Sequence, residues 1–305
     1  MTPLDTPLRE LLGVEFPIVQ APMANNAPPA LAAAVSAAGA LGSIGGAALS
    51  ADDLRAAIRE VRETTDRPFA VNLFAPPYLR EGTLEVVLEE RPRVFSFTFG
   101  VVDPAPLREA GIVVLGTATT TEEALALERA GVDAVVAQGA EAGGHRGSFL
   151  EGFPLVPVAE LVSSSVDQVS VPVVAAGGIM DGAGIAEAMR LGAQGVSLGT
   201  AFLFTPEAGR AREHLEALRS FETVVTDAYT GRPMRAARTP VLEELMTGPP
   251  PLPFPEQRKT AAEKGPLFMG GTGAARGREL GAADLVRLLV EEAAAAETAI
   301  SSHSD

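Results

Sequence analysis

The stretch VPVVAAGGIMDGAGIAEAMRLGAQGVSLGTAFL, residues 171–203, decides the fold. It reads as a strand that ends in Gly177 and Gly178, a helix that closes on Gly192, and a second strand that ends in Gly199 and Thr200. Both strand runs are apolar on both faces, as strands covered on both sides must be. The stretch therefore predicts a strand–helix–strand unit of a parallel sheet.

The same alternation continues over the first 205 residues. Helical patterns separate most of the apolar runs; one begins at Ser50 and another at Thr120 or Thr121, closing on Gly131. Eight such units in about 200 residues predict a (β/α)8, or TIM, barrel, with a doubly wound open sheet as the alternative. The barrel is favoured because no GxGxxG motif opens the first unit and because glycine and polar residues follow many different strands. The eight runs are 17–23, 40–46, 69–75, 93–100, 111–119, 133–139, 171–178 and 195–203.

The pattern changes after residue 205. The sequence predicts a helix at 206–220, an extended segment with a turn at 221–240, loops at 247–255 and 264–277, a final helix at 281–300 and a frayed tail. This part has too few strand signals for a core of its own. We therefore expect 206–305 to be an extension that packs on the 1–205 barrel and completes the same domain.

Composition narrows the function classes. The chain has 305 residues and a net charge of −15, so it lacks the basic surface that nucleic acids and anionic membranes require. It has no cysteine, which excludes disulfides, thiolate metal sites and a cysteine nucleophile. No secretory signal and no run of 18 apolar residues is present, so we expect a cytoplasmic protein without a membrane span.

The glycines after the last two predicted strands indicate a phosphate site. Gly177, Gly178, Gly199 and Thr200 stand where the loops after strands seven and eight of a barrel commonly bind phosphate through backbone N–H groups. Glycine is required there because a side chain would hold the phosphate away from the amides.

Amide side chains follow other strands. Asn72 and Gln138 end two of the apolar runs, and QAPMA (20–24) ends the first. Amides both donate and accept hydrogen bonds, which suits the alternating C=O and N–H edge of a flavin ring. Together with the phosphate loops, they favour a cofactor with a phosphate at one end and a polar ring at the other.

Three of these stretches resemble the nitronate monooxygenase family, once called 2-nitropropane dioxygenases, and the related flavin-dependent enoyl-acyl-carrier-protein reductases. They are QAPMA (20–24), QGAEAGGHRG (138–147) and AGGIMDGAGIAEAMRLGAQGVSLGT (176–200); TGRPMR (230–235) and PLFMGGTGA (266–274) extend the likeness. The resemblance implies a barrel that holds FMN non-covalently, a small-molecule substrate, O2, and His145 as the catalytic residue. No metal site is expected. With the phosphate glycines, the implied FMN contacts are Pro22, Met23, Asn72, Gln138, Gly143, Gly144, Gly177, Gly178, Ser197, Leu198, Gly199 and Thr200.

One motif departs from the family. Many members carry a histidine in the fourth-strand motif, where this chain has Thr98, and a proline after the glycine, where it has Val101. The departure affects the expected substrate more than the cofactor.

The three histidines differ in setting. His145 lies among glycines at a strand end, whereas His214 falls in a charged helix pattern that predicts a surface position, and His303 is in the tail. An imidazole at position 145 could take a proton from a carbon acid, give one, or stabilise an anion as imidazolium. Glu141 is expected to accept backbone N–H groups, and Arg146 is equally compatible with a solvated and a structural charge.

The leading hypothesis is FMN-dependent oxidation of nitronates or nitroalkanes by O2 to a carbonyl compound and nitrite. The alternative keeps FMN but makes the protein an NAD(P)H-dependent reductase of quinones or enoyl thioesters. A third hypothesis is a phosphate-binding barrel without flavin. A Schiff-base aldolase is excluded because the first 205 residues contain no lysine, and a thiolate dehydrogenase because there is no cysteine.

Overall fold

The computed structural model describes residues 4–24 and 27–301, and eight parallel strands form its central sheet. The strand order is β1-β9-β8-β6-β5-β4-β3-β2, and a parallel bridge between Val19 and Leu41 joins the two edge strands. This confirms the (β/α)8 barrel and excludes the open sheet. The strands are β1 (Ile18–Gln20), β2 (Gly42–Gly45), β3 (Phe69–Phe74), β4 (Val94–Thr98), β5 (Val113–Ala118), β6 (Ala134–Gln138), β8 (Val173–Ala176) and β9 (Gly195–Leu198).

Alternate residues of these strands face two different cores. Ile18 packs in the larger apolar cluster between the sheet and its helices, whereas its neighbour Val19 packs in a smaller cluster inside the barrel. Leu8 and Leu12, from helix α1 (Pro7–Leu12), belong to the inner cluster. Because α1 fills the amino-terminal end of the barrel, any ligand site is confined to the opposite end.

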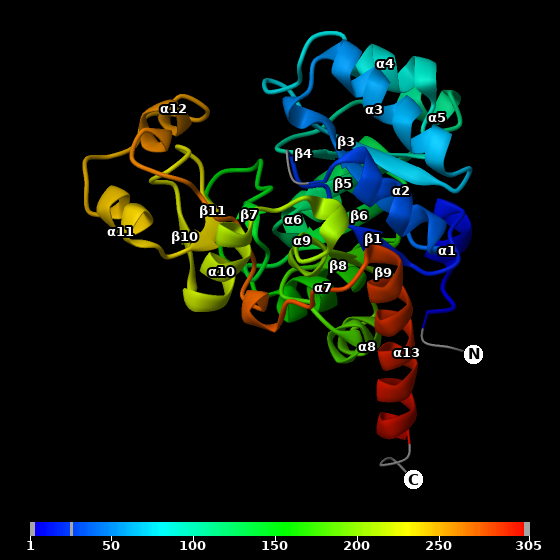
Figure 1. Cartoon of the computed structure of the whole chain (residues 1–305). Coiled ribbons are helices and arrows are strands. Elements are labelled where there is room, and N and C mark those ends of the chain that lie inside the picture. The colour runs from blue at the N-terminus through cyan, green and yellow to red at the C-terminus, as the bar shows by residue number, and fades with distance from the viewer. Residues whose placement is uncertain (1–3, 25–26, 302–305) are drawn as a thin grey trace.

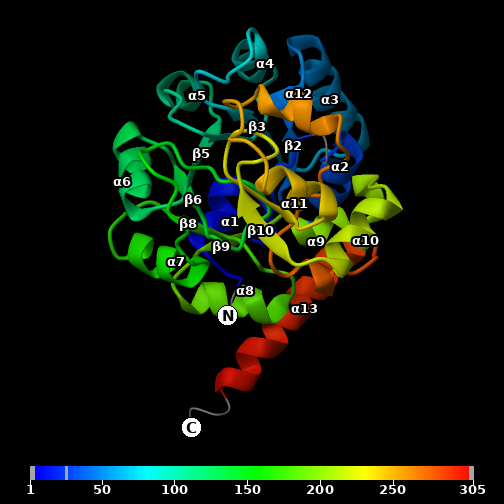
Figure 2. The ribbon, with the colours of Figure 1, turned by 90° about the vertical axis from the view of Figure 1, so that its left-hand side faces the viewer.

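Helices surround the sheet, as Figure 2 shows. Their ends follow the sequence signals: Ser50 and Thr120 accept backbone N–H groups of α3 and α6, and Gly131 ends α6 in the left-handed conformation. The covering helices are α2 (Pro29–Ala37), α3 (Ala51–Thr64), α4 (Thr83–Glu90), α5 (Ala105–Glu109), α6 (Thr121–Ala130), α7 (Val158–Val166), α8 (Gly182–Arg190) and α9 (Thr200–Leu203).

The later residues lie over the carboxyl end of the barrel (Figures 1 and 2). They form α10 (Arg212–Ser220), β10 (Thr223–Thr226), β11 (Met234–Ala237), α11 (Pro240–Met246) and α12 (Gln257–Ala262). We call residues 206–280 the cap. The last helix, α13 (Ala282–Ser301), leaves the cap and packs along α8 and α2 on the side of the barrel.

The cap contains more regular structure than the sequence indicated. β10, β11 and the two-residue strand β7 (Gly144–His145) form an antiparallel sheet. Tyr229, Met234 and Leu242 belong to an apolar cluster within the cap, so the expectation that this part lacks a core of its own was wrong. The division at residue 205 stays a prediction.

The helix expected at 206–220 is present in part, as a 3-10 turn at Pro206–Ala208 followed by α10. The expected loops are confirmed. The segment 247–255 is a loop, and 264–277 is a loop apart from a 3-10 turn at Ala274–Arg276. The final helix is present, whereas the tail at 302–305, with His303, lies outside the described residues. No helix of the described part is long and apolar enough to cross a membrane.

Candidate active site

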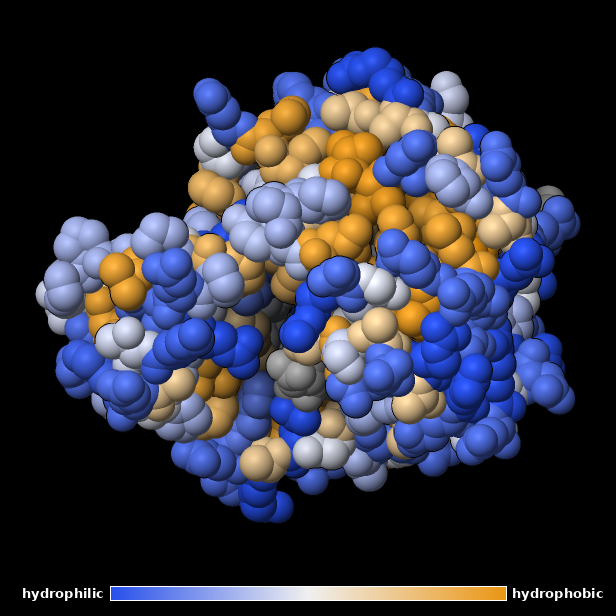
Figure 3. All heavy atoms as spheres, turned by 90° about the horizontal axis from the view of Figure 1, so that it is seen from above, coloured by the Kyte–Doolittle hydropathy of each residue, from blue (hydrophilic) through white to orange (hydrophobic). Residues whose placement is uncertain are grey.

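A cavity of about 550 Å³ lies between the carboxyl end of the barrel and the cap. In the view from above, the surface is hollowed between the smaller lobe and the barrel (Figure 3). All the site residues predicted from sequence line this cavity: Pro22, Met23, Asn72, Gln138, Gly143, Gly144, His145, Gly177, Gly178, Ser197, Leu198, Gly199 and Thr200. The fold thus brings together residues from five separate parts of the chain.

Three glycine-containing segments pack closely at one side of the cavity. Gly177 and Gly178 have φ angles of 128° and 69°, values that favour glycine. A Cβ on Gly178 would lie 3.1 Å from the Cβ of Glu141 and 3.2 Å from Oγ1 of Thr272. A Cβ on Gly143 would lie 2.5 Å from the carbonyl carbon of Gly270. The absence of side chains therefore lets three backbones meet beside the cavity.

Backbone N–H groups remain available at this place. Among the described residues, the amides of Gly178 and Thr200 donate no hydrogen bond. The Oγ1 of Thr200 accepts the amide of Gly271 at 2.9 Å, which ties the segment after β9 to the cap. The arrangement offers fixed donors to an anionic group.

The two predicted amide side chains also hold the protein together. Asn72 Nδ2 donates to Ser96 Oγ at 3.0 Å. Gln138 Oε1 accepts the amide of Gly147 at 2.8 Å, and its Nε2 donates to the carbonyl of His145 at 3.1 Å. An amide group has two donors and two acceptor positions, so each side chain retains capacity toward the cavity.

His145 lies in β7, which pairs with β11, and its ring is surrounded by aromatic side chains. The ring centroid is 5.9 Å from that of Phe99 and 5.3 Å from that of Phe254, both in edge-on contact. Burial, together with the nearby charges of Arg232 and Arg258, lowers the pKa of His145 to about 3. The imidazole is therefore neutral near pH 7.

Two charged side chains, one of them buried, hold the loop that carries His145. Arg146 is fully buried and donates to the carbonyls of Gly139 at 2.5 Å and Gln138 at 2.9 Å, so its role is structural rather than solvated. Glu141 accepts the amide of Val158 at 2.9 Å, as predicted. Both side chains fix the loop from beneath.

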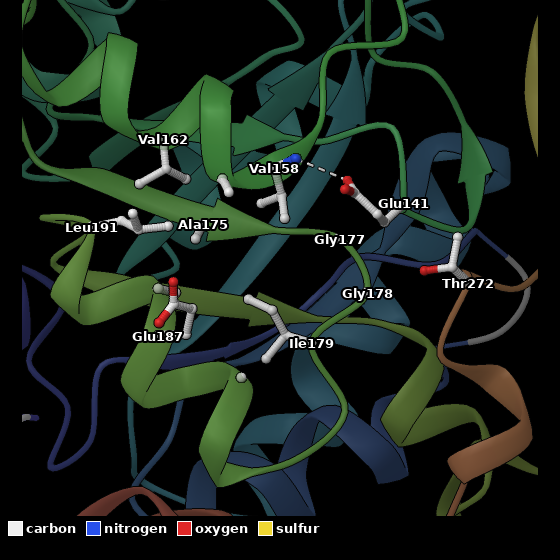
Figure 4. Close-up of a pocket in the computed structure, with 13 residues that line it drawn as sticks. Glu141, Val158, Val162, Ala175, Gly177, Gly178, Ile179, Glu187, Leu191 and Thr272 are labelled. Atoms are coloured by element: carbon white, nitrogen blue, oxygen red, sulfur yellow. Dashed lines mark hydrogen bonds between the residues drawn. The ribbon is translucent and has the colours of Figure 1, made fainter. Parts of the chain in front are cut away.

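A smaller cavity of about 210 Å³ lies behind the glycine turn, between α7 and α8 (Figure 4). Its walls are mostly apolar, with Val162, Ala175 and Ile179 among them. Glu141 also lines this cavity, and the dashed line in Figure 4 marks the hydrogen bond that its carboxylate accepts from the amide of Val158. The two cavities share Gly177 and Gly178.

The surface position predicted for His214 was wrong. His214 is buried and lines the large cavity, and its Nε2 lies 3.1 Å from the carbonyl oxygen of Met269. Its spacing to Ala217 and Leu218 places all three on the buried face of α10. The charged neighbours in the sequence belong to the other faces, and they concealed this spacing.

Several other residues that line the cavity were not predicted from the sequence. Phe254 and Arg258 come from the proline-rich loop and α12, and Phe99 follows β4 with a positive φ of 75°. Thr98, which departs from the family motif, lines the cavity as well. No local signal marked Phe254, because its importance comes from a contact with His145 far away in the chain.

The charge of the cavity differs from that of the whole molecule. The chain has 39 Asp and Glu residues, yet none is among the described residues that line the cavity. Arg210 and Arg258 do line it. Within the described part of the chain, no three His, Asp or Glu side chains converge in a way that could hold a metal ion. The cavity is thus suited to an anionic organic ligand.

Comparison with known proteins identifies the family of this chain. A family model described as nitronate monooxygenase matches residues 5–81 and 79–292. The chain belongs to the nitronate monooxygenase family. It is 42% identical to a nitronate monooxygenase of Pseudomonas aeruginosa, over 92% of this chain and 97% of the relative. It is 39% identical to a probable nitronate monooxygenase of Staphylococcus saprophyticus, over 86% and 89% of the two chains.

Solved structures of this superfamily share the fold over nearly the whole chain. A nitroalkane oxidase from Streptomyces ansochromogenes is 36% identical, with a TM-score of 0.90 over 96% of this chain and 99% of that one. FabK from Thermotoga maritima is 34% identical, with a TM-score of 0.84 over 98% and 99%. Because it belongs to the nitronate monooxygenase family, the protein is an oxidoreductase.

Proposed function

We propose that this chain binds FMN in the large cavity and uses O2 to oxidise nitronates to a carbonyl compound and nitrite. The observation that carries the proposal is the convergence of the predicted cofactor residues and His145 on one cavity, whose described lining residues include no Asp or Glu. When bound, FMN supplies the electron-acceptor chemistry and the reaction with O2. The protein supplies binding, orientation and exclusion of water.

The glycine side of the cavity fits the phosphate of FMN. The free amides of Gly178 and Thr200 would donate to phosphate oxygens, and a Cβ at Gly178 would press on Glu141 and Thr272 beside them. Because Gly177, Gly199 and Gly143 have no side chain, the backbone at these positions would be able to approach the phosphate closely. Ser197 and Leu198 end β9 beside them.

The opposite part of the cavity fits the flavin ring. Asn72 and Gln138 retain donor and acceptor capacity toward it, and Pro22 and Met23 offer apolar contact. His145 lines the same cavity and would be within reach of a substrate bound there. Because its imidazole is neutral, it acts as a hydrogen-bond partner or proton acceptor rather than as a fixed cation.

A matched pair of glycine variants tests the phosphate site. Gly178→Ala should weaken FMN binding by about tenfold or more, because the added Cβ would press on Glu141 and Thr272 and shift the donating amide. Gly111→Ala is the control: Gly111 has a similar φ of 78° but no atom within 4 Å of its Cβ position. FMN affinity is measured by fluorescence titration of the reconstituted proteins. Equal affinities would refute the site.

Kinetics test the role of His145. His145→Asn should retain FMN and lose most turnover with neutral nitroalkanes, by a factor of about 100 or more, because their carbon must give up a proton. Turnover of a pre-formed nitronate should fall much less. Unchanged nitroalkane turnover would rule out proton removal by His145.

The likeness to FabK supports a second candidate function, NAD(P)H-dependent reduction of quinones or enoyl thioesters. The purified protein is mixed with NADH or NADPH without oxygen while the flavin absorbance is followed. Slow bleaching is expected for a monooxygenase. Fast bleaching would favour the reductase.

A further inference from the structure

The motif TGRPMR (230–235) has no role in the proposed function so far, yet it holds the histidine loop along its length. Pro233 accepts the amide of Arg146 at 2.8 Å, and Met234 is the β-ladder partner of His145. The Arg235 guanidinium donates to the carbonyl of Ala140 at 2.9 and 2.8 Å. The first residue of the motif, Thr230, contacts the imidazole of His145.

From this contact we infer that Thr230 is a positioning residue that selects the Nε2–H tautomer of His145 and leaves Nδ1 as the proton acceptor. The inference rests on the proposed function only for its catalytic meaning. The Oγ1 of Thr230 lies 3.2 Å from Nε2 of His145 and is fully buried with its residue. Among the described residues, this is the ring's one hydrogen bond.

Counting protons assigns the direction of that bond. A threonine hydroxyl has one proton, and Thr230 donates it to the carbonyl of Arg232 at 2.8 Å, the usual length for an O–H···O bond. A carbonyl oxygen cannot donate in return. The hydroxyl oxygen must therefore accept from Nε2, which requires a proton on Nε2 and a lone pair on Nδ1.

The hydroxyl has little freedom to choose another partner. The amides of Thr230 and Gly231 donate to the carbonyl of Asp227 at 3.1 and 2.7 Å, closing a turn. Gly231 has a φ of 78°, and a Cβ there would lie only 2.1 Å from the carbonyl oxygen of Leu252. The turn is thus locked between the barrel loop and the proline-rich loop.

The side chain of Arg232 locks the same turn from the other direction. Its guanidinium lies 4.0 Å from the ring centroid of Phe99, in cation–π contact, and donates to the carbonyl of Ser148. Phe99 also packs against His145. The acceptor carbonyl of Arg232 and the ring are therefore fixed relative to each other.

The tautomer determines how a neutral nitroalkane would react. The bond between carbon and hydrogen breaks, the proton goes to Nδ1, and the electron pair stays on the substrate as the nitronate. The ring then carries protons on both nitrogens, and the Nε2–H bond to Thr230 stabilises that charge. A pre-formed nitronate needs no such step and would not depend on Thr230.

The first test reads the tautomer directly, with nitrogen-15 NMR of the holoprotein and His145→Asn to assign the ring signals. Wild type is expected to show a neutral ring with its proton on Nε2. Thr230→Val, which removes the hydroxyl at nearly constant shape, should mix the two tautomers or reverse them, and Thr230→Ser should restore the wild-type pattern. A proton on Nδ1 in wild type, or unchanged signals in Thr230→Val, would overturn the inference.

The second test is kinetic. Thr230→Val should lower kcat for a neutral nitroalkane by about tenfold or more, with KM and nitronate turnover within about threefold of wild type. Thr230→Ser should recover the rate. Equal loss on both substrates would show a merely structural role. If His145→Asn keeps full nitroalkane activity, the proposed catalytic role fails while the NMR result for the tautomer still stands.

Discussion

At the scale of single residues, the surroundings of His145 govern its protonation in the folded protein. An unfolded histidine titrates near 6.5, whereas burial and the nearby charges of Arg232 and Arg258 hold the folded pKa of His145 at about 3. Between these values the unfolded chain binds a proton that the folded protein does not. Stability should therefore fall as the pH decreases from 6.5 toward 3.

His145→Asn should reduce this acid sensitivity. Below pH 6.5, wild type is expected to lose up to on the order of 1 kcal/mol per pH unit more than the variant, because only wild type has this histidine to protonate. His214, whose pKa burial also lowers, contributes equally to both proteins and cancels. Chemical denaturation of the two holoproteins over a pH series measures the difference. Parallel curves would contradict a buried neutral His145.

At the scale of elements, loops of the cap complete a site that barrel strands begin. The proline-rich loop brings Phe254 against His145, and β11 pairs with β7. Sequence patterns predicted the eight barrel strands because each is an apolar run bounded by turn residues. They did not predict β7, since two residues are too few to show a period.

Phe254→Ala should remove one of the two aromatic rings, Phe99 and Phe254, that contact the imidazole of His145. Water would then reach the ring, so the pKa of His145 should rise toward 6.5. Leu252→Ala is the matched control, because Leu252 lies in the same loop and is 49% exposed. NMR titration of the His145 ring measures both pKa values. A similar shift in the two variants would mean that loop motion, not the Phe254 ring, controls the environment.

Contact between α8 and α13 gives another prediction. A Cβ on Gly182 would lie 2.2 Å from the backbone nitrogen of Ala293, so Gly182→Ala must push the two helices apart and should cost about 1–3 kcal/mol. Gly184→Ala in the same helix meets atoms no nearer than 3.4 Å and should be neutral or stabilising. Urea denaturation compares them. Equal stabilities would show that α13 does not press on α8.

At the scale of the whole molecule, a chain of net charge −15 encloses a cavity lined by arginines and by no described carboxylate. Arg258→Gln should raise KM for a nitronate by roughly three- to tenfold, because the anion loses a nearby charge, and should leave KM for a neutral nitroalkane unchanged. Arg67→Gln, an exposed charge just before β3, is the control. Steady-state kinetics at low and high salt measure the effect; an equal rise with both substrates would refute it.

Features marked by local sequence signals could be predicted, whereas contacts between distant parts of the chain could not. Alternating runs predicted the barrel, and the glycine positions predicted the phosphate site, because these signals are local. Most of the other proposed cofactor contacts came from motifs that resemble the nitronate monooxygenase family. The aromatic contacts and the hydroxyl partner of His145 could not be predicted in this way. Thr230 lies 85 residues from His145 in the chain, and only the folded cap brings them together. His214 was misassigned because a charged neighbourhood does not reveal which helix face is buried.

The most direct test of nitronate oxidation is oxygen uptake by the purified, FMN-loaded protein with a pre-formed nitronate. Nitrite is measured in the same sample. For a nitronate monooxygenase we expect rapid oxygen consumption, with nitrite formed in proportion, at a rate well above NAD(P)H oxidation with a quinone. Absence of oxygen uptake and nitrite with the nitronate, together with fast NAD(P)H-dependent quinone reduction, would contradict it.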